Sequence, residues 1–177
     1  MVIQLQAFLD GGFSLGEAKG QNRFIQADPG GHVNRFSITE STTSGMAVHL
    51  FQQCELSPSF VIGARSVQLG GSSGLGSGAH FIVESCEFNR SFLHFRPESA
   101  AILNIEPDHL DQYKDLDDIQ NAFRTFINKV PFYGAAVLSV DDPAVQSLIP
   151  QVKRRIVTYG TSAQADVRLS DVKLEGL

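Results

Sequence analysis

The sequence predicts an α/β fold, with a mostly parallel sheet whose two faces are covered by helices. Its short apolar runs are continuous rather than alternating with polar residues, which is typical of strands buried on both faces. These runs alternate along the chain with segments of helical periodicity, as in α/β proteins. A chain of 177 residues with 42% hydrophobic content can hold one such core, and a second complete domain would be cramped.

Three helices and five strands are predicted after residue 44. In chain order they are a helix at 45–54, strands at 59–64, 79–85 and 100–106, a helix at 115–130, a strand at 134–140, a helix at 142–150 and a strand at 154–160. The second helix is the clearest, because its apolar side chains form one stripe: Ile119, Ala122, Phe123, Phe126 and Ile127. Residues 1–36 have no clear period, so no element is predicted there.

The glycine-rich segment 68–78 is expected to be a loop, because it is too long for a hairpin turn. It does not fit a dinucleotide-binding loop, which must open a helix, whereas this segment precedes a strand. A flexible loop near a ligand and a plain linker both fit it.

Charge and cysteine content limit the class of protein. A net charge of -5 and a pI near 5.4 argue against a nucleic-acid or anionic-membrane surface, which needs clustered Lys and Arg. Cys54 and Cys86 fit buried thiols in a reducing compartment better than a disulfide framework. Residues 1–20 lack a basic start and a long apolar core, so neither a signal peptide nor a membrane span is expected. A cytoplasmic location is therefore predicted.

Acidic residues follow two of the predicted strands, at the strand ends where α/β proteins bind ligands. Glu84 and Glu87 lie at the end of strand 79–85. The end of strand 100–106 carries a second group: Glu106, Asp108, His109 and Asp111. Mg²⁺ takes carboxylate oxygens together with water and phosphate, so two such groups on neighbouring strands predict a magnesium site. Taken singly, solvated turns explain the acidic residues, and a cap or a surface position explains His109.

A run of Ser and Thr residues, from Ser37 to Ser44, leads into the first predicted helix. One explanation is capping, since these side chains satisfy the free amides of a first helical turn. Another is a phosphate or metal–phosphate site, because hydroxyls and free amides at a helix N-terminus face an anion. The run contains Glu40 and no Lys, and the residues by themselves leave both explanations open.

Five segments together are more specific than any one of them. They are SFVIGA at 59–64, ESCEFNRSFLHF at 84–95, NIEPDHLDQY at 104–113, NKVPFYGAAVLSVDDP at 128–143 and VTYG at 157–160. In this order and at these spacings they resemble the central ATP-binding domain of the Mur ligases, and within that family the branch that adds L-alanine. The resemblance runs from about residue 41 to residue 168.

The resemblance implies an enzyme of peptidoglycan precursor synthesis, with ATP and Mg²⁺ as cofactors and UDP-N-acetylmuramate and L-alanine as substrates. In that family ATP phosphorylates the muramyl carboxylate, the alanine amino group attacks the acyl phosphate, and an amide forms with release of ADP and phosphate. Phosphorylation turns a poor electrophile into a reactive one, and Mg²⁺ neutralises the charge that develops.

By position, the resemblance also implies roles for particular residues. Glu84 and His109 match the family's metal ligands and are the catalytic candidates. Ser41 matches the hydroxyl that follows the phosphate-loop lysine and binds Mg²⁺, and Thr42 and Thr43 lie beside it in the same cofactor-binding run.

Further candidates lie in two other motifs of the family. Asn128 falls in a nucleotide-binding stretch. The motif that lines the substrate cleft contains Glu87, Asn89 and Arg90, for which the sequence implies no individual role.

The chain departs from the family at its phosphate loop, which reads G-T-H-G-K-[ST]-T-T. When the last residues are placed on 41–43, Glu40 stands at the lysine, and Phe36 and Thr39 stand at the two glycines. The glycines let backbone amides wrap the phosphates and the lysine meets their oxygens, whereas a glutamate repels them. ATP binding by this chain is therefore expected to be weak or absent.

These observations divide the chain into residues 1–40, which do not resemble the family, and 41–177, a Mur ligase central domain incomplete at the phosphate loop. The sheet is expected to lack the strand before this loop, which would leave an exposed edge. No ligase turnover is expected from this chain alone.

Several explanations remain open. The protein is either an ATP-incompetent relative that acts as a binding or regulatory module, or a ligase domain in which residues 1–40 come from another reading frame. A related Mur ligase that attaches a tripeptide is a further alternative.

Overall fold

The structure is a computed structural model that describes residues 2–3, 13–14, 24–25, 33–38, 41–107 and 111–170. Its strands are β1 (Val2–Ile3), β2 (Phe13–Ser14), β3 (Phe24–Ile25), β4 (Asn34–Ile38), β5 (Ser59–Ser66), β6 (Gly71–Gly74), β7 (His80–Glu84), β8 (Ser99–Ile102), β9 (Ala135–Ser139), β10 (Ile156–Gly160) and β11 (Val167–Arg168). Its helices are α1 (Ser41–Gln53), η1 (Phe88–His94), α2 (Leu116–Ile127), α3 (Pro143–Leu148) and η2 (Ile149–Gln151).

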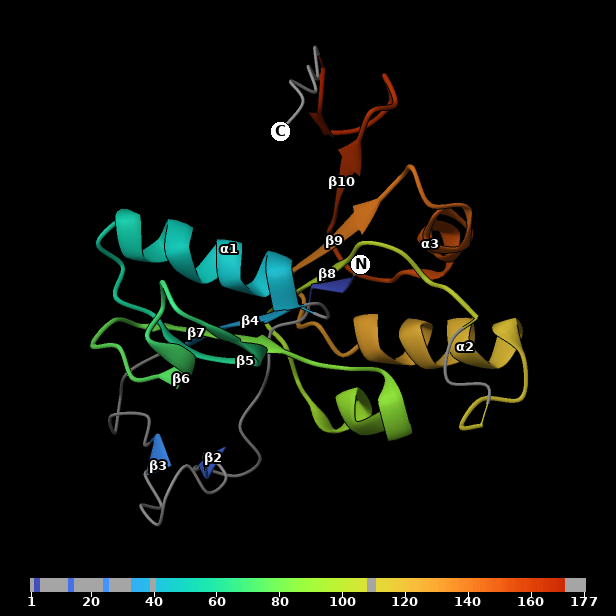
Figure 1. The fold of residues 1–177 in the computed structure, drawn as a ribbon. Coiled ribbons are helices and arrows are strands. Elements are labelled where there is room, and N and C mark those ends of the chain that lie inside the picture. Colours follow the sequence, from blue (N-terminus) through green and yellow to red (C-terminus); the bar gives the residue numbers. More distant parts are fainter. Residues whose placement is uncertain are drawn as a thin grey trace, which may run out of the picture.

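One mixed sheet organises the chain, in the order β11-β10-β9-β8-β4-β7-β5-β6 (Figure 1). The neighbours from β5 through to β11 are parallel, while β6 pairs with β5 in the antiparallel direction. β1 pairs antiparallel with β8, and β2 and β3 form a separate pair. β4 therefore lies in the middle of the sheet, between β7 and β8.

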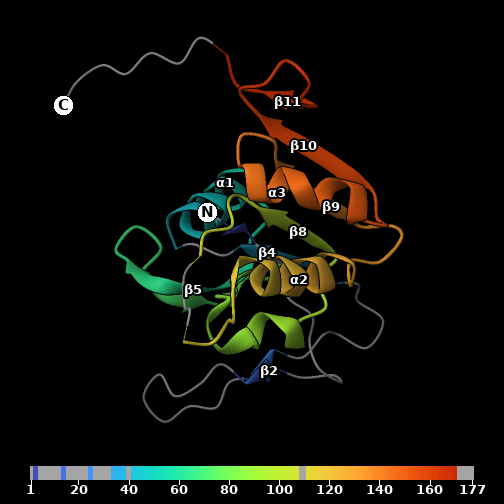
Figure 2. The ribbon, with the colours of Figure 1, turned by 90° about the vertical axis from the view of Figure 1, so that its right-hand side faces the viewer.

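Helices cover both faces of this sheet, with α1 and α2 on opposite sides (Figure 1 and Figure 2). α1 packs with β4, β5 and β7 around a core of Ile38, Val48, Phe60, Ile62 and Ile82. The larger core lies under η1, α2 and α3, against β8 and β9. The predicted α/β fold, with helices on both faces of a mostly parallel sheet, is confirmed.

The helix starts follow from local sequence. Asp115 caps α2, because its carboxylate accepts a hydrogen bond of 2.9 Å from the backbone N–H of Asp118. Asp142 caps α3 in the same way, and Pro143 occupies the first turn, where no N–H is needed. All five apolar side chains predicted to form the stripe of α2 are buried.

Two predictions for the sheet are wrong. The segment 68–78 contains β6, which forms a hairpin with β5: Ser66 pairs with Gly71, and Gly70 takes the left-handed φ of 76° that the turn requires. The expectation that the strand before α1 is missing is also wrong, because β4 occupies that place and pairs with both neighbours.

The cysteine prediction needs one correction. Cys54 and Cys86 are not joined in a disulfide, as expected, but both are exposed rather than buried. Among the described helices, none is long and apolar enough to cross a membrane.

Candidate functional site at the carboxyl ends of the central strands

The order of the strands reverses at β4: β5 and β7 lie on one side of it, and β8 and β9 lie on the other. This reversal marks where a ligand would bind. The helix that follows β4 lies on one face of the sheet, and the helix that follows its neighbour β8 lies on the other. Such a reversal opens a crevice outside the carboxyl ends of the two strands. The prediction that the two acidic groups follow neighbouring strands is wrong. The groups follow β7 and β8, and β4 lies between these two strands.

Buried hydroxyls hold the end of β4 in place. The Ser44 hydroxyl donates to the carbonyl of Ile38 at 3.1 Å, and the Ser37 and Ser85 hydroxyls lie 2.8 Å apart. The backbone N–H of Ser85 also donates to Ile38, at 3.0 Å. Part of the serine run is therefore structural, because it joins β4 to the first turn of α1 and to the exit of β7.

The remaining hydroxyls of the run stand at the start of α1. The helix begins at Ser41, so the hydroxyl run does open a helix, as the sequence predicts. Thr42 is exposed and Thr43 is half-buried, while the side chain of Ser41 lies outside the described part of the chain. Because the run lies at the crevice, its role in phosphate binding stays a prediction.

Glu84 ends β7 and reaches across to β5. Its Oε2 accepts a hydrogen bond of 2.6 Å from the backbone N–H of Gly63. A side chain at position 63 would collide with the carboxylate, since an added Cβ would lie 2.7 Å from Oε1. The glycine in SFVIGA is thus explained by the close approach of a catalytic candidate.

Replacing Gly63 with Ala is expected to push the Glu84 carboxylate off β5 and to lower the free energy of unfolding by about 1 kcal/mol. Gly45 offers a matched control, because an added Cβ there meets nothing within 4 Å. Gly45→Ala should raise the free energy of unfolding by about 0.5–1 kcal/mol, as expected for alanine inside a helix. Urea denaturation of the two variants measures both changes in the free energy of unfolding. Changes of the same sign in the two variants would contradict the close approach of Glu84 to position 63.

The motif after β7 folds into η1 and is held by residues that the sequence analysis missed. The Arg90 guanidinium pairs with the Asp118 carboxylate at 2.5 Å and lies 4.6 Å from the centre of the Tyr113 ring. The Tyr113 hydroxyl donates to the carbonyl of Glu87 at 2.7 Å. Asn89 and Arg90 both have φ of 55°, a strained left-handed conformation for non-glycine residues. No pattern in the sequence signals this tertiary network.

One carboxyl group and one phenol group in the network have shifted pKa values. Hydrogen bonds from the Lys114 backbone and from Arg90 lower the pKa of Asp118. Burial raises the pKa of Tyr113 to about 12, an effect that the nearby Arg90 charge partly offsets. The network therefore stays an ion pair beside a neutral phenol through the physiological pH range.

The predicted magnesium ligands are described only in part. His109 and Asp108 lie outside the described residues, as does the Ser41 side chain. Glu106 is exposed and accepts a hydrogen bond of 2.5 Å from the Asn104 amide. Within the described ranges, no three His, Cys, Asp or Glu side chains come together as metal ligands. The magnesium site thus stays a prediction.

Asn128 lies away from the other candidates. It ends α2, which leads into the start of β9, so it stands at the opposite edge of the sheet from Glu84. Its amide donates to the carbonyls of Arg124 and Gln151 at 2.9 and 3.2 Å and accepts from the backbone N–H of Lys153 at 2.8 Å. These bonds use the side chain to join the end of α2 to the segment before β10.

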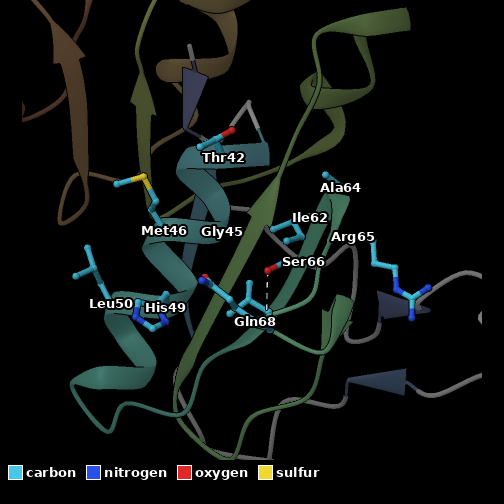
Figure 3. Close-up of a pocket in the computed structure, with 11 residues that line it drawn as sticks. Thr42, Gly45, Met46, His49, Leu50, Ile62, Ala64, Arg65, Ser66 and Gln68 are labelled. Carbon is cyan, nitrogen blue, oxygen red and sulfur yellow. Dashed lines mark hydrogen bonds between the residues drawn. The ribbon is translucent and has the colours of Figure 1, made fainter. Parts of the chain in front are cut away.

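A hollow of about 410 Å³ lies beside α1, between this helix and β5 (Figure 3). Its α1 wall contains Thr42, near the start of the helix, and the side chains of Met46 and Leu50, each 60% exposed. Ile62 forms part of the opposite wall. No hollow is predicted here from the sequence, although apolar residues on the exposed side of a helix are a signal for one.

Comparisons with known proteins fit this arrangement. The sequence model of the Mur ligase middle domain matches residues 77–176. The UDP-N-acetylmuramate–L-alanine ligase of Anaeromyxobacter dehalogenans is 43% identical over 137 residues, which are 77% of this chain and 30% of the relative. The enzyme of the same name from Myxococcus xanthus is 42% identical over 77% of this chain and 29% of its own length. The chain thus spans about 30% of the length of these curated relatives.

A solved structure agrees with the sequence comparisons. The UDP-N-acetylmuramate:L-alanyl-gamma-D-glutamyl-meso-diaminopimelate ligase from Neisseria meningitides matches with a TM-score of 0.63 and 27% identity, over 68% of this chain and 43% of that one. The fold and its crevice define a doubly wound α/β domain with Glu84 and the start of α1 at the carboxyl edge. The chain belongs to the Mur ligase family, through the middle domain of these enzymes.

Proposed function

We propose that this chain is the middle-domain part of an ATP-dependent ligase that joins L-alanine to UDP-N-acetylmuramate in peptidoglycan precursor synthesis. The observation that carries the proposal is that the start of α1 and Glu84 follow the carboxyl ends of two paired parallel strands, β4 and β7. The names of the 41–44% identical curated relatives support L-alanine as the amino acid.

The residues at the crevice suit the chemistry of the family. A carboxylate at Glu84 and a hydroxyl at Ser41 are oxygen ligands of the kind that Mg²⁺ prefers, and His109 would complete the set from the exit of β8. When bound, Mg²⁺ supplies charge neutralisation during phosphoryl transfer. The contact with Gly63 orients the Glu84 carboxylate at the end of β7.

We further propose that this chain alone binds Mg-ATP weakly and does not turn over. β4 runs to Ile38 and pairs with β8 at residues 36–38, and α1 begins at Ser41, so two residues connect strand and helix. A phosphate-wrapping loop needs several residues between strand and helix, with glycines and a lysine. Positions 36–38, which match the start of that loop, are strand residues here.

A thermal denaturation experiment with Mg-ATP tests this proposal. A site filled at about ten times its Kd adds about 1.4 kcal/mol to the free energy of unfolding, which raises the Tm of a domain of this size by about 3–6 °C. We expect no such rise for the natural chain and a measurable rise for Glu40→Lys, which restores the family's cation. Glu55→Lys, the same charge change just beyond the other end of α1, should behave like the natural chain.

Three outcomes would contradict the proposal. A full Tm rise in the natural chain would mean that Glu40 does not block ATP. Identical behaviour of Glu40→Lys and Glu55→Lys would remove the role given to position 40. Phosphate release from this chain that depends on both UDP-N-acetylmuramate and L-alanine would show that it turns over by itself.

An ATP-incompetent binding module is the second candidate, and the short β4–α1 connection favours it. It predicts that Glu40→Lys gains no nucleotide binding while the natural chain still binds UDP-N-acetylmuramate. A tripeptide-adding ligase is the alternative within the family, as the similarity to the enzyme from Neisseria meningitides suggests. Competition between L-alanine and the tripeptide, measured in a complete ligase that contains this segment, separates the two acceptors.

A further inference from the structure

Basic residues that are scattered in the sequence gather at the edge of the sheet opposite the candidate site. This edge is formed by the starts of β8, β9 and β10 and by the end of α2. It carries six cations: Arg96, Arg124, Lys129, Lys153, Arg154 and Arg155. None of the six forms an ion pair with another described residue. The ion pairs in the described part of the chain join Arg35 to Glu98 and Arg90 to Asp118. A protein of net charge -5 thus has one strongly positive edge.

A hollow of about 520 Å³ lies in this edge, between the end of α2 and the segment that leads into β10. Three of the six cations line it, together with two amides and one hydroxyl: Arg124, Thr125, Asn128, Lys129, Gln151 and Lys153. Every lining side chain can donate a hydrogen bond, and none is a carboxylate. A multivalent anion would find both charge and donors there.

The walls of the hollow are fixed by hydrogen bonds to neutral groups. Arg124 Nη1 donates to Gln151 Oε1 at 3.0 Å, and Lys129 Nζ donates to the carbonyl of Leu93. The Asn128 amide joins the two sides, as described above. These neutral acceptors hold the side chains of Arg124 and Lys129 without cancelling their charge, so this part of the positive potential is organised before any ligand arrives.

Stabilisation of the C-terminal end of α2 is the simpler explanation for cations at this place. The carbonyls of that end are already bonded, however. The carbonyl of Arg124 accepts from the backbone and side chain of Asn128, and those of Phe126 and Ile127 accept from the backbone N–H groups of Lys129 and Val130. Burial, and to a lesser extent the charge of Arg96, lowers the pKa of Lys129.

We infer that this hollow binds the di- or triphosphate group of a small molecule, at a site separate from the ligase crevice. A phosphate chain offers several anionic oxygens to Arg124, Lys129 and Lys153 at once. A free nucleotide and inorganic polyphosphate both carry this group. The inference rests on the charge and hydrogen bonds of this edge and does not depend on the proposed ligase function.

A titration with sodium tripolyphosphate, without Mg²⁺, tests the site by two-dimensional amide NMR of the complete chain. We expect saturable shifts at residues 124–129 and 151–153. Lys153→Gln combined with Arg124→Gln keeps the backbone bond from position 153 to Asn128 and should weaken binding about tenfold or more. Arg65→Gln removes an exposed cation on β5 and serves as the control, with an unchanged Kd expected.

The outcomes separate this site from the ligase crevice. Shifts confined to residues 41–44, or equal weakening by the control variant, would overturn the inference. Absence of saturable shifts would overturn it as well. A nucleoside triphosphate that binds this hollow more tightly than tripolyphosphate would assign it to nucleotides, and equal affinity would assign it to the phosphate chain alone. Tighter binding of a polyglutamate peptide would overturn the small-molecule assignment in favour of an acidic protein segment.

Discussion

Replacing Phe92 with Ala is expected to lower the free energy of unfolding by about 3–5 kcal/mol. Phe92 is the fully buried residue of η1, and its ring lies 5.1 Å from that of Phe123 and 5.3 Å from that of Phe126. Truncation removes these aromatic contacts and leaves a cavity under the segment that carries Glu87, Asn89 and Arg90. Urea denaturation followed by circular dichroism measures the loss.

Phe88 provides the matched control for this substitution, because it belongs to the same short helix and is 47% exposed. Phe88→Ala is expected to cost about 1 kcal/mol or less, since little of the space it leaves is enclosed. A cost for Phe92→Ala no larger than that for Phe88→Ala would mean that η1 does not pack on α2 as the structure shows. The cleft motif would then lack its anchor.

Raising the pH from about 10 to 12 is expected to destabilise the protein through ionisation of Tyr113. Burial raises the pKa of this phenol from 10.0 to about 12 in the folded state. The group therefore stabilises the fold fully below pH 10, and this contribution is lost as the pH rises through 12. The free energy of unfolding should fall by up to about 1.4 kcal/mol per pH unit in this window.

Urea midpoints measured at a series of alkaline pH values test this expectation. Tyr113→Phe cannot ionise, so its slope in the same window should be smaller than that of the natural chain. Tyr159, whose pKa burial also raises, supplies the comparison: Tyr159→Phe should keep the part of the slope that comes from Tyr113. Equal slopes for the natural chain and Tyr113→Phe would rule out the burial of this phenol as the cause.

Most of the parallel sheet and its helices could be predicted from the sequence, because buried strands and amphipathic helices carry their own periodic signal. Other strands carry no such signal, and β6 and β4 show why. β6 is Gly-Ser-Ser-Gly, an edge strand with almost no apolar side chain to mark it. β4 contains Arg35, whose charge is accommodated by an ion pair of 2.6 Å with Glu98, a partner 63 residues away. A short window of sequence cannot show such a partner.

The candidate site was predictable only in part, for the same physical reason. Glu84 stands out because it follows a clear strand, whereas its contact with Gly63 depends on how β5 and β7 align. The pairing of Arg90 with Asp118 joins two segments that nothing in the sequence links. The expectation for Asn128 came from the resemblance, and the bonds that occupy its amide are made across α2 and the next connection.

The central place of β4 has a consequence for how the chain folds. This strand is made early in synthesis, yet its neighbours come much later: Ser37 meets Ser85 across 48 residues and Arg35 meets Glu98 across 63. Closing such long loops costs entropy before any contact is gained, so the sheet should assemble slowly and late. β7 and β8 lie on either side of β4, and neither can reach the other without it. A polypeptide started at residue 41 would therefore lack the strand that pairs with both β7 and β8, however well its sequence matched the family.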